Sequence, residues 1–123
     1  MPGRHFYSKL HTIIVNLILD ECADGDPLPS MRVLAEKHGA NPLTVAKAYQ
    51  PLIARGIIRP AAGIGLFVAP GGVAKLRQHE RIRFLTETWP ALHKEASLLG
   101  IDLDDLARDA LSQSAHATAV TLA

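Results

Sequence analysis

Five basic side chains lie within a short middle stretch of this 123-residue chain and are the residues best suited to a chemical role. They are Arg32, Lys37, Lys47, Arg55 and Arg59. The same stretch holds a single acidic residue, whereas the segment 71–123 holds six basic and seven acidic residues. The formal net charge of the whole chain is only +1, so the excess of positive charge is confined to residues 32–59. This distribution favours contact with a phosphate backbone.

The spacing of the other reactive side chains predicts neither a metal site nor a catalytic site. His79 and His93 are two heptads apart on one predicted helix face, but about 21 Å separates them along a straight helix, which is too far to share an ion. Ser30, His38 and Asp26 are close in sequence, yet they suit caps and turns and not a nucleophile, base and acid. We therefore expect no enzymatic activity, no metal and no cofactor.

The composition and the N-terminal sequence indicate the cellular compartment of the protein. Apolar residues make up 48% of the chain but never form a run of 18 or more, so we expect no membrane span and no membrane partner. The N-terminus lacks the continuous apolar stretch of a signal peptide. The single cysteine, Cys22, has no partner for an internal disulfide and is expected to be packed or exposed near a helix end. We predict a cytoplasmic protein.

Apolar residues at helical spacing predict three helices in the first half of the chain, at about 7–22, 31–38 and 42–55. Ser30 suits the N-cap of the second helix, and Gly39 can take the positive φ that ends it. Asn41 suits the N-cap of the third helix, with Pro42 at its first position. The second helix is expected to turn three residues inward: Val33, Leu34 and Ala35. Two short helices around a tight glycine turn are the helix-turn-helix pattern.

The third helix has two distinct faces. Its apolar face is predicted to be buried and consists of Val45, Ala48, Tyr49, Leu52 and Ile53. Its opposite face carries Leu43, Lys47, Gln50 and Ala54, with Thr44 and Ala46 on the flanks. This outer face is the candidate reader of a DNA major groove, because a helix fits there and its N-terminal residues reach the base edges.

A short β-hairpin is predicted after the third helix. Residues 57–60 and 66–69 are rich in β-forming side chains and flank a glycine-bearing turn, which is the pattern of a wing. Pro70, Gly71 and Gly72 then form a linker, so the winged helix-turn-helix DNA-binding domain is predicted to span residues 1–70.

The second part of the chain, 71–115, is predicted to be a helical dimerisation region. Its first helix carries apolar residues that advance by three and four positions along one seam: Ile82, Leu85, Trp89, Leu92, Ala96 and Leu99. Asp102 is predicted to cap a second helix, and residues 116–123 are expected to be frayed or disordered. The fold class is therefore mostly α with a small β-hairpin, a winged helix-turn-helix followed by a two-helix dimerisation tail.

Linked motifs in the first half resemble the GntR family of regulators, and within it the short YtrA-like branch. Residues 28–35, Leu-Pro-Ser-Met-Arg-Val-Leu-Ala, resemble that family's L-P-S-x-R-x-L-A segment. Residues 41–49, Asn-Pro-Leu-Thr-Val-Ala-Lys-Ala-Tyr, resemble the N-P-x-T-V-x-K-A-Y of the YtrA-like branch. The likeness covers about residues 7–69. It implies a homodimeric repressor of a small operon, often one encoding a transporter, and of its own gene.

The resemblance also implies roles for individual residues. It implies that Arg32 meets double-stranded DNA at the groove edge, and that the wing backbone around Gly63 and Gly65 approaches the minor groove. It places the start of the third helix on bases or phosphates through Asn41, Leu43, Thr44 and Lys47. Gln50 lies on the same outer face, and Arg59 with backbone N–H groups is expected to hold phosphate. A two-fold dimer is expected to recognise an inverted-repeat operator.

Three features depart from the family pattern. Pro51 lies inside the third helix, where it removes a hydrogen bond to the carbonyl of Lys47 and predicts a kink or an early end. The wing tip has no basic residues. Pro90 interrupts the tail helix and predicts a bend near Thr86.

Alternatives remain open for some residues and for the whole chain. Arg32 can instead form an ion pair with Glu36 on its own helix, and Thr44 can simply cap or pack. The alternative function is a winged-helix protein-interaction module that scaffolds a complex without specific DNA binding. The cations of the outer face favour DNA over that alternative. A small-molecule effector is neither predicted nor excluded.

Overall fold

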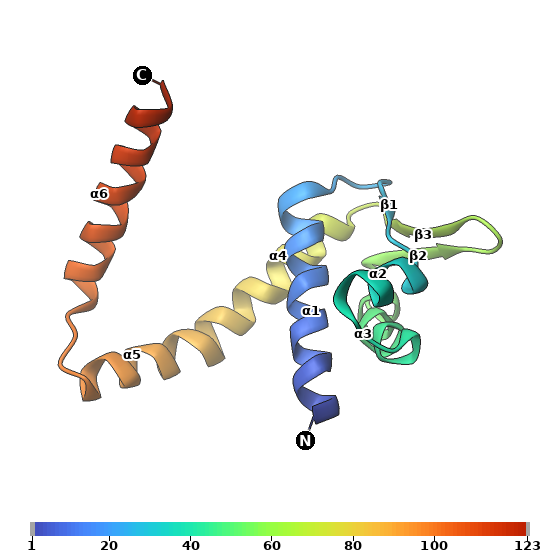
Figure 1. Cartoon of the computed structure of the whole chain (residues 1–123), viewed down its shortest axis with the longest axis horizontal. Helices are drawn as coiled ribbons and strands as arrows, with labels where there is room; N and C mark the ends of the chain where they lie inside the picture. Colours follow the sequence, from blue (N-terminus) through green and yellow to red (C-terminus); the bar gives the residue numbers. More distant parts are fainter. Residues whose placement is uncertain (1, 123) are drawn as a thin grey trace. The chain divides into compact units, whose positions relative to one another are not determined.

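The computed structural model describes residues 2–122, with side chains described for residues 9–112. The chain divides into two compact units, Met1–Glu80 and Arg81–Ala123. The elements of the first unit are α1 (Pro2–Glu21), β1 (Pro27–Leu28), α2 (Met31–His38), α3 (Pro42–Ala54), β2 (Ile58–Ala61), β3 (Gly65–Val68) and most of α4 (Gly72–Arg83) (Figure 1). The second unit continues with a π-helical turn, η1 (Phe84–Thr88), then α5 (Trp89–Leu98) and α6 (Leu103–Leu122).

The predicted caps define the helix-turn-helix. Ser30 Oγ accepts the N–H of Val33 at 3.2 Å, and Gly39 ends α2 with a φ of 62°. Asn41 Oδ1 accepts the N–H of Leu43 at 2.9 Å at the start of α3. Because each cap satisfies an N–H group that the first helical turn leaves unpaired, both helices begin where the sequence predicted.

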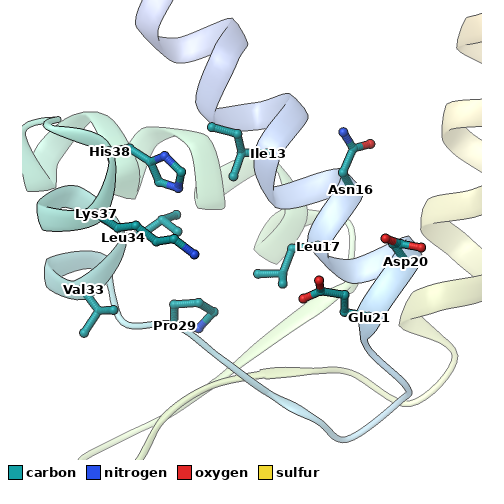
Figure 2. Close-up of a pocket in the computed structure, with 10 residues that line it drawn as sticks. All are labelled: Ile13, Asn16, Leu17, Asp20, Glu21, Pro29, Val33, Leu34, Lys37 and His38. Atoms are coloured by element: carbon teal, nitrogen blue, oxygen red, sulfur yellow. The ribbon is translucent and has the colours of Figure 1, made fainter.

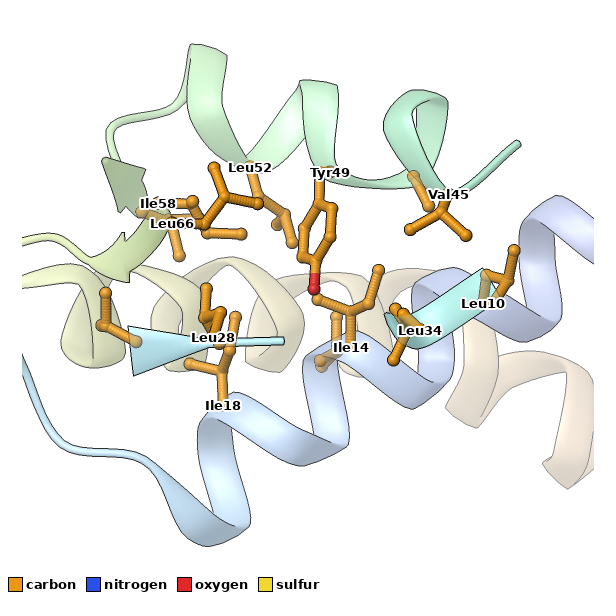
Figure 3. Close-up of a cluster of buried hydrophobic side chains, with 14 of the residues drawn as sticks. Leu10, Ile14, Ile18, Leu28, Leu34, Val45, Tyr49, Leu52, Ile58 and Leu66 are labelled. Atoms are coloured by element: carbon orange, nitrogen blue, oxygen red, sulfur yellow. The ribbon is translucent and has the colours of Figure 1, made fainter. Parts of the chain in front are cut away.

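The core of the first unit lies between α1 and α3. Tyr49, fully buried, projects from α3 toward α1 (Figure 3). Around it lie aliphatic side chains from α1, α2, α3 and all three strands, among them Leu10, Ile14, Ile18, Leu28, Leu34, Val45, Leu52, Ile58 and Leu66. This packing confirms the predicted inner face of α3, with Ile53 half-buried at its edge. The prediction that Val33 faces inward was wrong, because its side chain is 53% exposed.

Pro51 does not end α3. The helix continues to Ala54, and Arg55 follows as its C-cap, with its N–H bonded to the carbonyl of Pro51. Leu52, the next residue, is fully buried, and its carbonyl accepts the N–H of Ile57 at 2.9 Å. Packing of Leu52 therefore holds the last turn in place despite the donor that Pro51 lacks, and the predicted early end was wrong.

The wing belongs to a three-stranded antiparallel sheet with the order β1-β3-β2. β2 pairs with β3 in the predicted hairpin, from Ile58 opposite Val68 to Ala61 opposite Gly65. The added strand, β1, pairs with the other edge of β3 and was not predicted. It has two residues, which is too short to show the alternation that reveals a strand.

The first compact unit extends past the predicted boundary at residue 70 to Glu80. Leu76 of α4 is fully buried in the core of this unit. The carboxylate of Asp24 accepts N–H groups at the start of α4, from Gly71 at 2.8 Å and Val73 at 3.2 Å. Nε2 of His11 on α1 lies 3.5 Å from Oε1 of Glu80. The first turns of α4 are therefore part of the first compact unit, whereas the sequence analysis placed them in the helical region 71–115.

The second unit contains an irregular turn at the place where Pro90 predicted one. The N–H of Trp89 donates to the carbonyl of Phe84, five residues back, and Pro90 follows in the first turn of α5. Thr86 Oγ1 donates to the carbonyl of Ile82 at 2.8 Å. A π turn of this kind widens the helix by one residue, which accommodates Pro90, whose nitrogen has no hydrogen to donate.

The predicted cap of the last helix is present. Asp102 Oδ1 accepts the N–H of Asp104 at 2.9 Å, and Gly100 precedes it with a φ of 69°. Residues 116–123 were expected to be frayed or disordered, whereas the backbone of α6 is helical through Leu122, and residue 123 lies outside the described part of the chain.

Candidate nucleic-acid interface

The outer face of α3 carries the predicted reading residues. Burial of Val45 and Tyr49 fixes the rotation of the helix about its axis. Leu43, Lys47 and Gln50 consequently point away from the core, and all three are exposed. Thr44 and Ala46 are half-buried on the flanks, as predicted. Asn41, also exposed, uses its side chain to cap the helix, so its Oδ1 is already bonded within the chain.

Several basic side chains of the first unit are exposed and can reach an external partner. Arg32 stands exposed one residue into α2, and no ion pair with Glu36 occurs among residues 9–112, whose side chains are described. Within the same range, no carboxylate pairs with Lys37, Lys47, Arg55 or Arg59 either. Exposed cations without a local carboxylate are the groups that can neutralise phosphates.

The wing presents backbone and an apolar tip. Gly63 and Gly65 have φ values of 75° and 142°, a region that side chains rarely adopt, and a Cβ at either glycine would meet nothing within 4 Å. Between them Ile64 is 77% exposed, and its N–H closes the turn on the carbonyl of Ala61 at 3.0 Å. Arg59 is exposed on β2 opposite Phe67 of β3. The wing therefore offers one cation on its stem and an uncharged tip. The sequence prediction did not single out Ile64.

The apolar seam of the second unit is uncovered within the chain. Its large side chains are between 42% and 65% exposed, namely Ile82, Leu85, Trp89, Leu92 and Leu99, whereas Ala96 is buried. The π turn changes the register that the heptad predicted, because the N–H of Trp89 bonds to the carbonyl of Phe84. Phe84, which the sequence prediction missed, thus lies one turn before Trp89. The placement of Phe84 one turn before Trp89 follows from the π hydrogen bond, which heptad spacing in the sequence cannot predict.

A separate pocket of about 380 Å³ lies between α1 and α2 (Figure 2). Its apolar wall includes Leu17 and Leu34, and its rim carries charges of both signs. Lys37 of α2 extends into the space that faces Asp20 and Glu21 of α1 (Figure 2). The positive charge of Lys37 therefore faces carboxylates of the same domain, which separates it from the cations beside the outer face of α3.

Two groups in the core have raised pKa values. Burial raises the pKa of the Tyr49 hydroxyl to about 12, and the nearby Cys22 adds to this effect. Burial likewise raises the pKa of the Cys22 thiol, with smaller contributions from Asp26 and Glu21. Both groups are therefore neutral at physiological pH, and neither offers an activated nucleophile.

Two further properties concern the described residues as a whole. Within this part of the chain, no three histidine, cysteine or acidic side chains are placed to hold a metal ion. None of the described helices is long and apolar enough to cross a membrane.

The sequence of the first unit is similar to known proteins. Residues 6–68 match a family model described as bacterial regulatory proteins of the gntR family. Over 82 residues the chain is 35% identical to the HTH-type transcriptional repressor YtrA of Bacillus subtilis strain 168. That alignment covers 67% of this chain and 62% of the repressor, which is less than two thirds of the relative's own length.

Solved structures resemble a larger share of the chain. A GntR family transcriptional regulator from Listeria monocytogenes is similar with a TM-score of 0.64 and 28% identity, over 86% of this chain and 92% of that one. A transcriptional regulator from Oenococcus oeni is similar with a TM-score of 0.61 and 31% identity, over 85% of this chain and 89% of that one. The resemblance in these two cases extends beyond the helix-turn-helix into the tail.

Proposed function

Because this chain belongs to the GntR family of bacterial regulatory proteins, we propose that it is a homodimeric repressor that binds duplex DNA at specific sequences. The observation that carries the proposal is the outer face of α3. It is exposed from Leu43 through Lys47 to Gln50, starts at a capped helix N-terminus, and is rigidly backed by the buried Tyr49. A helix held in this way can enter the major groove with its first turn at the base edges.

The surrounding groups supply phosphate contacts. Arg32 on α2 and Lys47 on α3 neutralise phosphates at the groove edge, and Arg59 with the backbone of the wing does so at the adjacent minor groove. Exposure of all three cations, without an ion pair among the described side chains, supports these roles. Such contacts set affinity and register, whereas Leu43, Thr44 and Gln50 supply base selectivity.

A second copy of the chain completes the regulator. The uncovered side chains of the second unit form an apolar surface that includes Ile82, Leu85, Trp89, Leu92 and Leu99. An exposed apolar seam of this size is unusual on a monomer and is self-complementary in a two-fold dimer. Two α3 helices related by a two-fold axis recognise an inverted repeat whose half-sites lie about one helical turn, or a multiple of it, apart.

The resemblance to the YtrA-like branch points to the targets. The Bacillus subtilis relative is named a repressor. We infer that this chain likewise represses a small operon, such as one encoding a transporter, and its own gene.

Footprinting on the DNA upstream of the protein's own gene tests this function. The expected result is protection of one inverted repeat at protein concentrations that leave the flanking sequence open. The matched control is Lys94→Ala, which removes an exposed cation from α5 and not from α3, and it should protect the same repeat equally well. Uniform protection without a preferred repeat, or none at all, contradicts sequence-specific repression.

A further inference from the structure

Leu43 is an unusual residue for its position. Its side chain is 70% exposed, yet it occupies the second position of α3, where its N–H is bonded to the Asn41 cap. Within residues 9–80 the large apolar side chains that are strongly exposed are Val33, Leu43 and Ile64, and of these Leu43 alone lies on α3. A rigid, capped turn therefore presents an aliphatic group to the surroundings.

The geometry of α3 determines which way this group points. Residues 43, 47 and 50 recur at one helical turn or two, so Leu43 shares a stripe with Lys47 and Gln50. The two polar residues occupy the later turns, and Leu43 occupies the first turn. In a helix that enters the major groove from its N-terminal end, the first turn lies closest to the base edges.

The chemistry of leucine limits what it can recognise there. Leucine has no donor or acceptor, so placing it against the polar edge of guanine, adenine or cytosine removes water without replacing the lost hydrogen bonds. Thymine is the DNA base that presents an apolar group, its C5-methyl, in the major groove. We propose that Leu43 reads a thymine C5-methyl group in each operator half-site. This inference rests on the proposed function and names the base that this residue selects.

Replacing thymine by uracil removes this methyl group and leaves every hydrogen-bonding group of the base unchanged. Each thymine of one mapped half-site is replaced in turn, and binding is measured by fluorescence anisotropy at fixed salt. The parent protein should lose about three- to fivefold in affinity at one position, the effect of one buried methyl group. Leu43→Ala should bind the two duplexes equally at that position. Ile64→Ala, which trims an equally exposed side chain on the wing, should retain the parent's preference.

Two results overturn the inference while leaving the proposed function intact. One is a parent protein that binds the operator but is indifferent to uracil at every thymine. The other is a Leu43→Ala variant with the parent's full loss at the same position. Since Leu43 is exposed, the variant is expected to fold, and circular dichroism checks this. A parent protein that binds no duplex from the upstream region overturns the proposed function and this inference together.

Discussion

The hydroxyl of Tyr49 donates a 2.8 Å hydrogen bond to the backbone carbonyl of Pro29. This contact joins the middle of α3 to the segment that leads into α2. Because Tyr49 is fully buried, its hydroxyl has no easy replacement partner in water. The bond therefore fixes how the two helices of the helix-turn-helix lie against each other, and hence where Arg32 stands relative to Lys47.

Tyr49→Phe should lower the free energy of unfolding by about 1–2 kcal/mol, because it removes the hydrogen bond to the half-buried Pro29 carbonyl. Urea denaturation at pH 7 measures the difference. Thr86→Val is the matched control, since it also removes a hydroxyl bonded to a carbonyl but at an exposed position. An equal loss in both variants contradicts a special role for the Tyr49 bond.

The raised pKa of Tyr49 makes the same comparison depend on pH. The hydroxyl ionises near pH 10 in the unfolded chain and at about 12 in the folded protein. Between these values the unfolded state releases a proton that the folded state keeps, so the stability that Tyr49 contributes is present below pH 10 and is lost as pH rises toward 12. Phenylalanine has no ionisable hydroxyl, so the stability of the Tyr49→Phe variant lacks this pH dependence. The difference in unfolding free energy between parent and variant should therefore decrease by about 1–2 kcal/mol between pH 9.5 and 11.5. A constant difference contradicts the assignment.

Local signals in the sequence predicted much of this fold, and contacts between distant segments explain the rest. The caps at Ser30 and Asn41 bond to residues two or three positions away, so residue type and spacing reveal them. The carboxylate of Asp24 instead caps α4 across 47 residues of chain. No local pattern encodes that pairing, and the extension of the first unit through Leu76 was missed for the same reason.

The candidate interface shows the same division. Periodicity predicted the outer face of α3, because its buried face repeats at helical spacing. Periodicity did not predict the exposed Val33, since an eight-residue helix has too few turns to define a stripe. It also missed Phe84, because the π turn breaks the repeat that the heptad rule assumes.

Pro51→Ala should raise the melting temperature and increase the free energy of unfolding by about 1–3 kcal/mol, because the new N–H can bond to the carbonyl of Lys47. Differential scanning fluorimetry measures it. Pro42→Ala is the control, since a proline at the first helical position costs nothing and its removal should bring no gain. A Pro51→Ala protein that melts below the parent shows that packing of the half-buried ring outweighs the missing bond.

The double variant Trp89→Asp, Leu92→Asp should be a monomer, because two charges on the apolar seam cannot be buried against a second copy. Sedimentation velocity at micromolar concentration distinguishes the two states. Ile64→Asp places a charge on a more exposed apolar residue of the first unit and should leave the dimer intact. A double variant that stays dimeric places the interface elsewhere.

We propose above that Arg32 and Lys47 hold DNA so that the outer face of α3 can read it. The direct test is the affinity of the Arg32→Ala, Lys47→Ala double variant for the footprinted operator, measured beside the parent and Lys94→Ala at one fixed salt concentration. We expect at least about a tenfold loss of affinity for the double variant, with circular dichroism unchanged, and parent-like affinity for Lys94→Ala. Binding of the folded double variant at the parent's full strength contradicts it.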